Sequence, residues 1–240
     1  MNVIVCNNAE AVADKAYEIV ADIITAKPDA VLGLATGSTP VGLYRRLIEG
    51  YRQGKLSFRK IRSLNLDEYV GLPETHDQSY RYFMNDNLFD HIDIDKAETH
   101  VPCGTADDLQ KAADEYTRLA ASMPRDVQIL GIGSNGHIAF NEPGTPFDSE
   151  THIVTLKEST RRDNARFFAS IDEVPTHAVT MGIKTILNAK KIILVATGTN
   201  KADAVYNMIN GPISEDCPAS ALRNHPDVDV IVDRDAAAKL

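Results

Sequence analysis

Short apolar, often β-branched runs recur along the chain and alternate with amphipathic stretches. The strand-sized runs are Val3–Cys6, Ala30–Ala35, Ile61–Leu66, Val127–Ile132, Ile153–Leu156, His177–Met181, Ile192–Thr197 and Val228–Val232. Several are apolar at consecutive positions, which is typical of strands that are covered on both faces of a parallel sheet. Helical spacing marks Ala9–Thr25, Val41–Gln53, Ala106–Ser122 and Thr199–Asn210. The alternation predicts an α/β fold with an open, mostly parallel, Rossmann-like sheet and helices on both faces.

Composition and charge narrow the class of protein. No linker, low-complexity tract or repeat array divides the chain, so residues 1–240 are predicted to form a single domain. A formal charge of −9 argues against nucleic acid and membrane surfaces as partners, because both are polyanionic. Neither a signal peptide nor an apolar run of the roughly 20 residues that span a membrane is seen. The three cysteines are odd in number and far apart, which favours reduced thiols in a cytoplasmic protein.

Two of the predicted strands end in nearly the same residues. Leu32–Pro40 reads LGLATGSTP and Ile193–Lys201 reads ILVATGTNK, so Ala-Thr-Gly and a hydroxyl residue precede a helix in both. Glycine permits a tight turn there, and the unpaired N–H groups of a helix start favour an anion. One such turn alone is more consistent with an ordinary capped βα turn, whereas two at one sheet edge favour a phosphate site. Its predicted ligands are Thr36, Gly37, Ser38, Thr39 and, as a cation, Lys201.

Two acidic residues, Asp67 and Glu68, follow the predicted strand Ile61–Leu66 directly. A helix cap or a solvated pair would be the structural interpretation. The functional interpretation is a general base, because strand ends face the ligand crevice of such sheets and partial burial raises a carboxyl pKa. Adjacent side chains project apart, so only one is expected to reach a substrate. Asp67 is the predicted base.

The segment 131–144 reads GIGSNGHIAFNEPG and contains G-x-G-x-x-G after a strand. With Glu158 further along, this matches the arrangement of dinucleotide-binding sites. That fingerprint needs its last glycine inside a packed helix, and residues 141–146 (NEPGTP) would break a helix soon after it begins. We therefore reject a dinucleotide site.

The same segment is instead interpreted as a glycine-lined loop that carries Asn135, His137 and Glu142. A histidine beside a carboxylate and an amide is suited to proton transfer near neutral pH. A lone histidine is more often structural, but the density of polar groups in an apolar setting favours catalysis here.

The sequence gives weaker signals for phosphate-binding arginines and none for a metal site or a nucleophile motif. Arg161, Arg162 and Arg166 lie in a predicted helix, Ser159–Phe168, and any of them could bind a phosphate, although surface arginines are the default. The histidines are dispersed without metal-ligand spacing, so no metal is expected. A G-x-S-x-G nucleophile elbow and a reactive-cysteine motif are both lacking.

Taken together, these segments resemble the glucosamine-6-phosphate deaminase (isomerase) family. The resemblance is carried, in family order over nearly the whole chain, by LGLATGSTPVGLY, NLDEYVGL, SYRYFMNDNLF, GIGSNGHIAFNEPG, ARFF and TGTNKA. It implies conversion of D-glucosamine 6-phosphate and water into D-fructose 6-phosphate and ammonia, without a metal or an organic cofactor.

The resemblance also implies roles for the residues already selected. Asp67 would move the C2 proton to C1 through an enolamine. His137, oriented by Asn135 and Glu142, would open the pyranose ring by moving a proton at the ring oxygen. The turn at residues 36–39 would hold the phosphate, with Arg166 and Lys201 as its cations.

Two departures from the family pattern bear on these expectations. Some members carry Asp where this chain has Asn135, so Glu142 is expected to be the main charge partner of His137. Longer, hexameric members bind an amino-sugar phosphate effector through basic residues that follow the NEPG segment. Because His152 and Val154 stand in that region, we expect no such regulation and a monomer or weak oligomer.

Two other functions share part of this pattern. A 6-phosphogluconolactonase would share the fold and the phosphate turn, but it would not need a base at the end of a strand. A non-catalytic sugar-phosphate sensor would need the anion turns alone and usually a DNA-binding domain, and no helix-turn-helix segment is seen.

Overall fold

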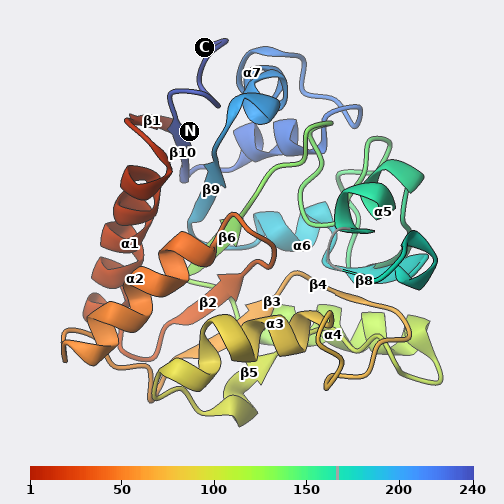
Figure 1. Cartoon of the computed structure of the whole chain (residues 1–240), viewed down its shortest axis with the longest axis horizontal. Coiled ribbons are helices and arrows are strands. Elements are labelled where there is room, and N and C mark those ends of the chain that lie inside the picture. Colours follow the sequence, from red (N-terminus) through yellow and green to blue (C-terminus); the bar gives the residue numbers. More distant parts are fainter. Residues whose placement is uncertain (166–167) are drawn as a thin grey trace.

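The central element of the computed structural model is a seven-stranded parallel sheet, drawn in Figure 1. Residues 1–165 and 168–240 are described. The strand order is β1-β10-β9-β6-β2-β3-β5, and each neighbouring pair is parallel. The strands are β1 (Asn2–Cys6), β2 (Val31–Leu34), β3 (Arg62–Asn65), β5 (Thr99–His100), β6 (Val127–Leu130), β9 (Ile192–Ala196) and β10 (Val228–Asp233). This topology confirms the predicted open α/β sheet.

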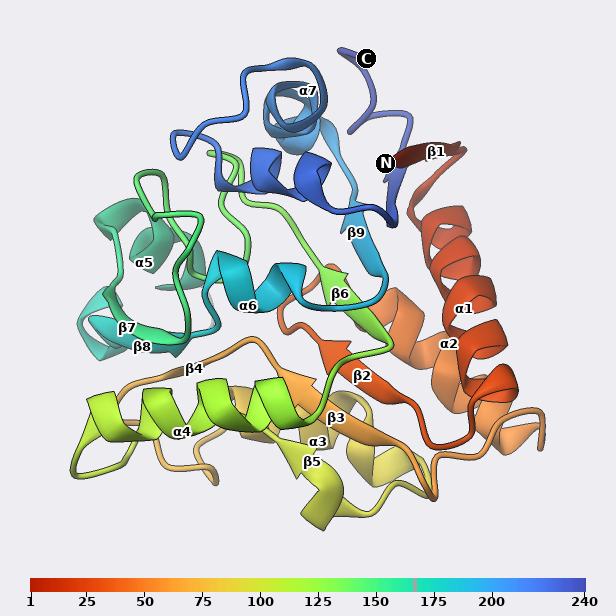
Figure 2. The same cartoon turned by 180° about the vertical axis from the view of Figure 1, so that it is seen from behind.

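Helices cover both faces of this sheet, as the doubly apolar strands predicted. Ile193 and Val195 of β9 belong to the core under the first set of helices, whereas Ile192 and Leu194 belong to the core under the second set. Figure 2 shows the second set from behind. The first set is α1 (Ala9–Ala26), α2 (Val41–Arg52) and α3 (Tyr80–Asn87). The second set is α4 (Leu109–Ser122), α6 (Ile183–Leu187), α7 (Ala202–Asn210) and the 3₁₀ helix η6 (Pro218–Asn224).

A second, three-stranded antiparallel sheet lies beside the carboxyl end of β3. It is ordered β4-β8-β7, with β4 (Asp67–Tyr69), β7 (His152–Thr155) and β8 (His177–Thr180). The predicted runs 153–156 and 177–181 are thus strands, but they do not join the parallel sheet. The chain leaves β3 after a single residue, and the Met181 N–H donates to the Leu66 carbonyl at 2.7 Å where the two sheets meet. Asp67 therefore begins a new strand directly above the parallel sheet.

Some element boundaries differ from the expectation. The predicted helix 199–210 starts with a 3₁₀ turn, η5 (Thr199–Lys201), before α7. Of the predicted helix 159–168, α5 (Glu158–Asn164) is observed and residues 166–167 lie outside the described part. Elements α3, α6, β4 and β5 were not predicted. Further 3₁₀ helices in the described part of the chain are η1 (Phe89–His91), η2 (Lys96–Glu98) and η4 (Ile171–Glu173).

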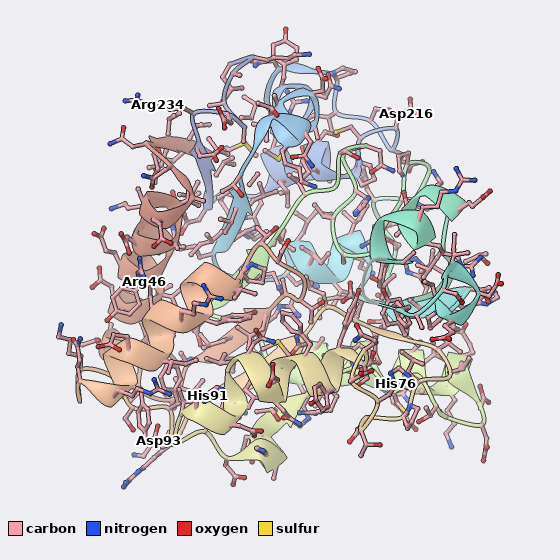
Figure 3. All side chains as sticks on the ribbon, in the orientation of Figure 1. Arg46, His76, His91, Asp93, Asp216 and Arg234 are labelled. Carbon is pink, nitrogen blue, oxygen red and sulfur yellow. The ribbon has the colours of Figure 1, made fainter. Side chains whose placement is uncertain are left out.

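Charged side chains are distributed over the outside of the fold. Figure 3 shows Arg46 and Arg234 projecting from the periphery. Arg46 joins α2 to α1 by ion pairs with Glu10 (2.6 Å) and Asp14 (2.5 Å). Such exposed pairs contribute little to stability. None of the helices among the described residues is long and apolar enough to cross a bilayer.

Candidate functional site

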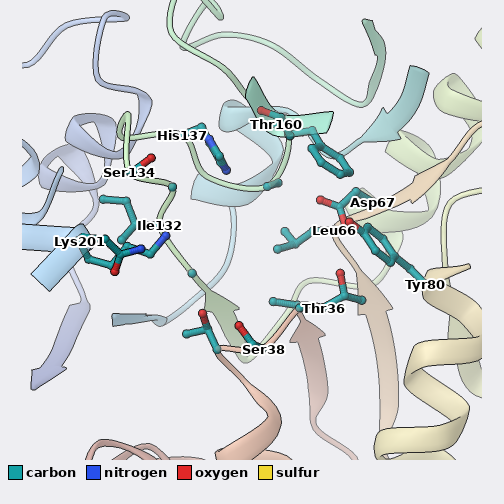
Figure 4. Close-up of a pocket in the computed structure, with 18 residues that line it drawn as sticks. Thr36, Ser38, Leu66, Asp67, Tyr80, Ile132, Ser134, His137, Thr160 and Lys201 are labelled. Carbon is teal, nitrogen blue, oxygen red and sulfur yellow. The ribbon is translucent and has the colours of Figure 1, made fainter. Parts of the chain in front are cut away.

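A cavity of about 320 Å³ opens at the carboxyl ends of four adjacent strands, β9, β6, β2 and β3. In open α/β sheets this edge is where ligands bind. Figure 4 shows Asp67, Tyr80 and Thr36 on one side of it, Lys201 and Ile132 on the other, and His137 above. The lining comprises Ala35–Thr39, Leu66, Asp67, Tyr80, Gly131–Ser134, His137, Ala139, Phe140, Thr160, Asn200 and Lys201.

The predicted phosphate turn forms one wall of this cavity. Thr36, Gly37, Ser38 and Thr39 all line it, and α2 starts two residues later. Gly37 has φ +86°, a conformation that other residues rarely adopt, and a Cβ there would meet nothing within 4 Å. The base of the turn is fixed by the buried Tyr44, whose hydroxyl donates to the Ala35 carbonyl (2.5 Å) and accepts from the Ala35 N–H (3.2 Å). The turn is therefore held by the core.

The second turn approaches the same cavity from β9. Gly198 repeats the positive φ of the first turn, at +90°, and its N–H donates to the Asp233 carboxylate at 3.0 Å. Asn200 and Lys201 line the cavity at the start of α7. The predicted juxtaposition of the two turns is thus observed. Arg166, the other predicted phosphate cation, lies outside the described residues.

Asp67 lines the cavity from the first position of β4, and only 6% of the residue is exposed. The described part of the chain supplies no hydrogen-bond donor to its carboxylate. Burial, reinforced by the neighbouring charge of Glu68, raises the pKa of Asp67 to about 8. A carboxylate of this kind is a stronger base than an ordinary aspartate, which is the property a proton-abstracting residue needs.

Glu68 points away from the cavity, as the alternation of adjacent side chains predicts. Its carboxylate accepts the backbone N–H groups of Tyr69 (2.8 Å), Tyr80 (2.9 Å) and Arg81 (2.9 Å). Burial raises the pKa of Glu68, while these three donors act in the opposite direction. Glu68 therefore ties β4 to the first turn of α3 and brings Tyr80 to the cavity wall.

A chain of hydrogen bonds links Glu142 to the ring of His137 through Asn135. The Asn135 amide nitrogen Nδ2 donates to Glu142 Oε2 at 2.7 Å. On the other side, Asn135 Oδ1 lies 2.7 Å from His137 Nδ1. Glu142 Oε2 is itself 3.8 Å from Nδ1, so a charged ring would form an ion pair with it. The three residues picked from the glycine-rich segment are thus brought together.

The bonds of Asn135 assign the neutral tautomer of the histidine. A carboxylate only accepts, so the amide NH₂ must face Glu142 and the amide oxygen must face the ring. That oxygen also only accepts, and Nδ1 must therefore carry the proton. In the neutral ring the lone pair therefore lies on Nε2, and His137 lines the cavity.

The glycines of the G-x-G-x-x-G sequence serve this histidine and not a nucleotide. A Cβ on Gly133 would lie 2.2 Å from the His137 ring, so only glycine leaves room for the imidazole. Gly136 has φ +85° and closes the turn through its N–H to the Gly133 carbonyl. No helix follows Gly136 before residue 158, as the helix-breaking residues 141–146 predicted.

The cavity residues that sequence reasoning missed include Tyr80 and Thr160. Burial raises the pKa of Tyr80 well above its ordinary value, so its hydroxyl stays a neutral donor. Its ring stacks on Phe140, with centroids 6.0 Å apart. Thr160, on α5, donates to Glu142 Oε1 at 2.5 Å. Ser79, which caps α3 by accepting the Tyr82 N–H, was a sequence signal that could have placed Tyr80 at a helix start.

Metal-ligating residues do not gather in the described part of the chain. No group of three or more His, Cys, Asp or Glu side chains there could hold a metal ion. Figure 3 labels His76 and His91 at separate places in the molecule. The cavity itself offers hydroxyls, an ammonium, an imidazole and a carboxylate, which suit acid–base chemistry on a phosphorylated substrate.

Known proteins resemble this chain over its full length. The profile of a family described as glucosamine-6-phosphate isomerases/6-phosphogluconolactonase matches residues 7–231. A glucosamine-6-phosphate deaminase of Bacillus velezensis is 52% identical over 238 residues, covering 99% of both chains. Glucosamine-6-phosphate deaminase 1 of Bacillus subtilis is 52% identical over 239 residues, also covering 99% of both.

Solved structures agree with the sequence comparison. The structure of a monomeric glucosamine-6-phosphate deaminase superposes with a TM-score of 0.98 at 52% identity, covering 100% of both chains. The 6-phosphogluconolactonase of Trypanosoma brucei has a TM-score of 0.81 at 21% identity, covering 100% of this chain and 98% of that one. The second likeness is one of fold alone.

Proposed function

Because the chain belongs to the glucosamine-6-phosphate isomerase/6-phosphogluconolactonase family, we propose that it converts D-glucosamine 6-phosphate and water into D-fructose 6-phosphate and ammonia. One observation carries the proposal: a single cavity contains the phosphate turn, the buried Asp67 carboxylate and the His137 imidazole. Full-length identity of about half with glucosamine-6-phosphate deaminases supports the choice of substrate.

The substrate phosphate binds at the two turns. The N–H groups and hydroxyls of residues 36–39 surround it at the start of α2, and Lys201 supplies positive charge. Arg166 is proposed as the second cation. Because the phosphate is remote from the reacting carbons, its binding energy serves to place C1 and C2 against the catalytic groups.

His137 opens the pyranose ring. Neutral Nε2 accepts the proton of the anomeric hydroxyl, and the imidazolium so formed gives this proton to the ring oxygen as the C1–O5 bond breaks, which yields the open-chain aldehyde and the neutral ring. The imidazolium that forms on the way is stabilised by Glu142 Oε2, which lies 3.8 Å from Nδ1. Asn135 keeps the ring in the tautomer that leaves Nε2 unprotonated at the start.

Asp67 then carries out the isomerisation. Its ionised carboxylate removes the proton from C2, and O1 takes up a proton of the substrate ammonium as the electron pair moves, which gives an enolamine between C1 and C2. The protonated Asp67 returns that proton to C1, which leaves an iminium at C2. Water adds to C2 and ammonia departs, so the product is the ketose fructose 6-phosphate. A pKa of about 8 suits a group that must first accept and then donate this proton.

The direct test is to mix the purified protein with glucosamine 6-phosphate and to assay ammonia and fructose 6-phosphate together. We expect equimolar formation of both products. The alternative, 6-phosphogluconolactonase activity, is tested by offering the lactone to the same preparation. Lactone hydrolysis without ammonia release would replace the proposed reaction, and binding of glucosamine 6-phosphate without turnover would indicate a sensor.

We further propose that residues 1–240 act as one glucosamine-6-phosphate deaminase-like domain, as a monomer or weak oligomer, in the cytoplasm. The 0.98 TM-score to a monomeric deaminase supports the first two points, and the three free cysteines suit a reducing compartment. Sedimentation equilibrium tests the assembly state. A sigmoidal substrate curve that N-acetylglucosamine 6-phosphate makes hyperbolic would contradict the proposed absence of allosteric regulation.

A further inference from the structure

Three hydrogen bonds connect α5 to the ring of His137. The Thr160 hydroxyl donates to Glu142 Oε1 at 2.5 Å, and Asn135 Nδ2 donates to Glu142 Oε2 at 2.7 Å. Asn135 Oδ1 completes the chain at His137 Nδ1, also at 2.7 Å. Thr160 is therefore the far end of an uninterrupted path to the histidine (Figure 4 shows both side chains on the same side of the cavity).

Each carboxylate oxygen of Glu142 receives one of these hydrogen bonds, and this fixes the plane of the carboxylate. Glu142 and Thr160 are both buried, so water does not readily replace the Thr160 hydroxyl as a donor. The remaining charge partner, Lys157, lies 3.9 Å from Oε2 and its side chain is half exposed. A buried carboxylate that loses one of two donors is left with an unsatisfied oxygen and freedom to rotate.

From this geometry we infer that Thr160 is a positioning residue for His137, which acts through Glu142 and Asn135. Its hydroxyl holds Glu142 so that Oε2 faces the Asn135 amide nitrogen, and Asn135 in turn keeps the proton on His137 Nδ1. The inference rests on the proposed ring-opening role of His137. It adds that α5 must be docked, with Thr160 against Glu142, for the histidine to be held in its working tautomer.

The test compares three single variants. Thr160→Val keeps the shape of the side chain and removes the hydroxyl, whereas Thr160→Ser keeps the hydroxyl. Thr151→Val is the matched control, because Thr151 is equally buried and its hydroxyl has no hydrogen-bond partner among the described residues. We expect Thr160→Val to lower kcat about 10-fold, the size of one charge-assisted hydrogen bond, and the other two to stay within about 2-fold.

A measurement other than the reaction rate, nuclear magnetic resonance, examines the protonation of His137 Nδ1 directly. In ¹⁵N-labelled protein without substrate, the Nδ1-bound proton of His137 should give a single sharp signal. Thr160→Val should broaden or split this signal, while Thr160→Ser and Thr151→Val should leave it unchanged. An unchanged signal in Thr160→Val, with thermal stability preserved, would overturn the inference.

A double-variant cycle separates action through Glu142 from a general packing effect. If Thr160 acts through Glu142, adding Thr160→Val to Glu142→Gln should lower kcat by less than 2-fold further. Additive losses would overturn the inference. Failure of the proposed function is distinguished by His137→Gln: if that variant turns over glucosamine 6-phosphate normally, the role of His137 is wrong, whatever Thr160 does.

Discussion

Two buried carboxylates serve the same cavity in opposite ways. Asp67 receives no hydrogen-bond donor from the described residues, and burial raises its pKa to about 8. Glu142 is buried to a similar degree but receives donors at both oxygens, from Thr160 and Asn135. Burial without donors raises the pKa of Asp67 and makes it a stronger base, whereas the two donors fix the position of the Glu142 carboxylate. The number of hydrogen-bond donors therefore distinguishes two carboxylates that are chemically similar and similarly buried.

The largest expected effect is that of Asp67→Asn on the reaction. The variant cannot accept the C2 proton, so we expect kcat to fall on the order of 1,000-fold, within the usual contribution of a general base. Ammonia release in the steady state measures the loss. Isothermal titration with fructose 6-phosphate should show binding within about 3-fold of wild type, because the phosphate turns are unchanged. A loss of binding together with activity would contradict the assigned role.

The same substitution should change how stability depends on pH. Folding raises the pKa of Asp67 from its ordinary value near 4, so the folded protein keeps a proton that the unfolded chain has already released. The contribution of protonated Asp67 to the unfolding free energy is complete below the pKa of the unfolded chain. It is lost as pH rises through the folded pKa of about 8. Asp67→Asn removes this dependence, so its advantage in unfolding free energy over wild type should grow by about 3 kcal/mol between pH 5.5 and 8.5.

Urea titrations at the two pH values test this expectation. Glu142→Gln is the control for the loss of a buried carboxyl group, since that carboxylate has donors at both oxygens whereas Asp67 receives none from the described residues. A constant difference between Asp67→Asn and wild type across the range would show that the Asp67 carboxylate is solvated in the folded protein.

Glu142→Gln should reduce activity less than the loss of the base. The neutral amide no longer stabilises imidazolium at His137, and its NH₂ group faces either the Asn135 amide or the Thr160 hydroxyl. We expect kcat to fall about 30-fold, which corresponds to about 2 kcal/mol. Steady-state kinetics over pH 6–9 measure the effect. Unchanged kinetics would mean that the relay has no part in catalysis.

The smallest expected effect is that of Asn135→Asp, the residue that some family members carry. The substitution places a carboxylate where the Asn135 amide nitrogen now lies 2.7 Å from Glu142, so the two acids would share a proton at neutral pH. We expect kcat within about 3-fold of wild type and a shift of the pH–rate profile to higher pH. An unmoved profile would show that the amide has no electrostatic role.

Much of this fold could be predicted from the sequence because its main sheet is doubly covered. A strand such as β9 is buried on both faces, so its sequence is an uninterrupted apolar run. Amphipathic helices precede and follow such strands. The antiparallel sheet carried no such signal. β4 is three residues long and begins with two acids, and β5 has only two residues, so tertiary pairing and not local pattern defines both.

The site was predictable where chemistry is concentrated in short motifs and was missed where distant segments supply single residues. The turn at residues 36–39, Asp67 and the His137 segment each follow a strand of the sheet, so a single rule located them. Tyr80 reaches the cavity because Glu68 anchors the start of α3, a contact that no spacing reveals. Thr160 comes from α5, and only the folded structure shows its bond to Glu142.

The two turns that are proposed to hold the phosphate are far apart in the sequence, and this matters for folding during synthesis on the ribosome. Thr36 emerges early, but Lys201 is translated when most of the chain has already left the exit tunnel. A sugar phosphate that needs both turns therefore stabilises no nascent chain that ends before residue 201, because a ligand stabilises only a state that can bind it. Nascent chains that lack the second turn are not stabilised against unfolding by the sugar phosphate. Folded chains that contain both turns are stabilised.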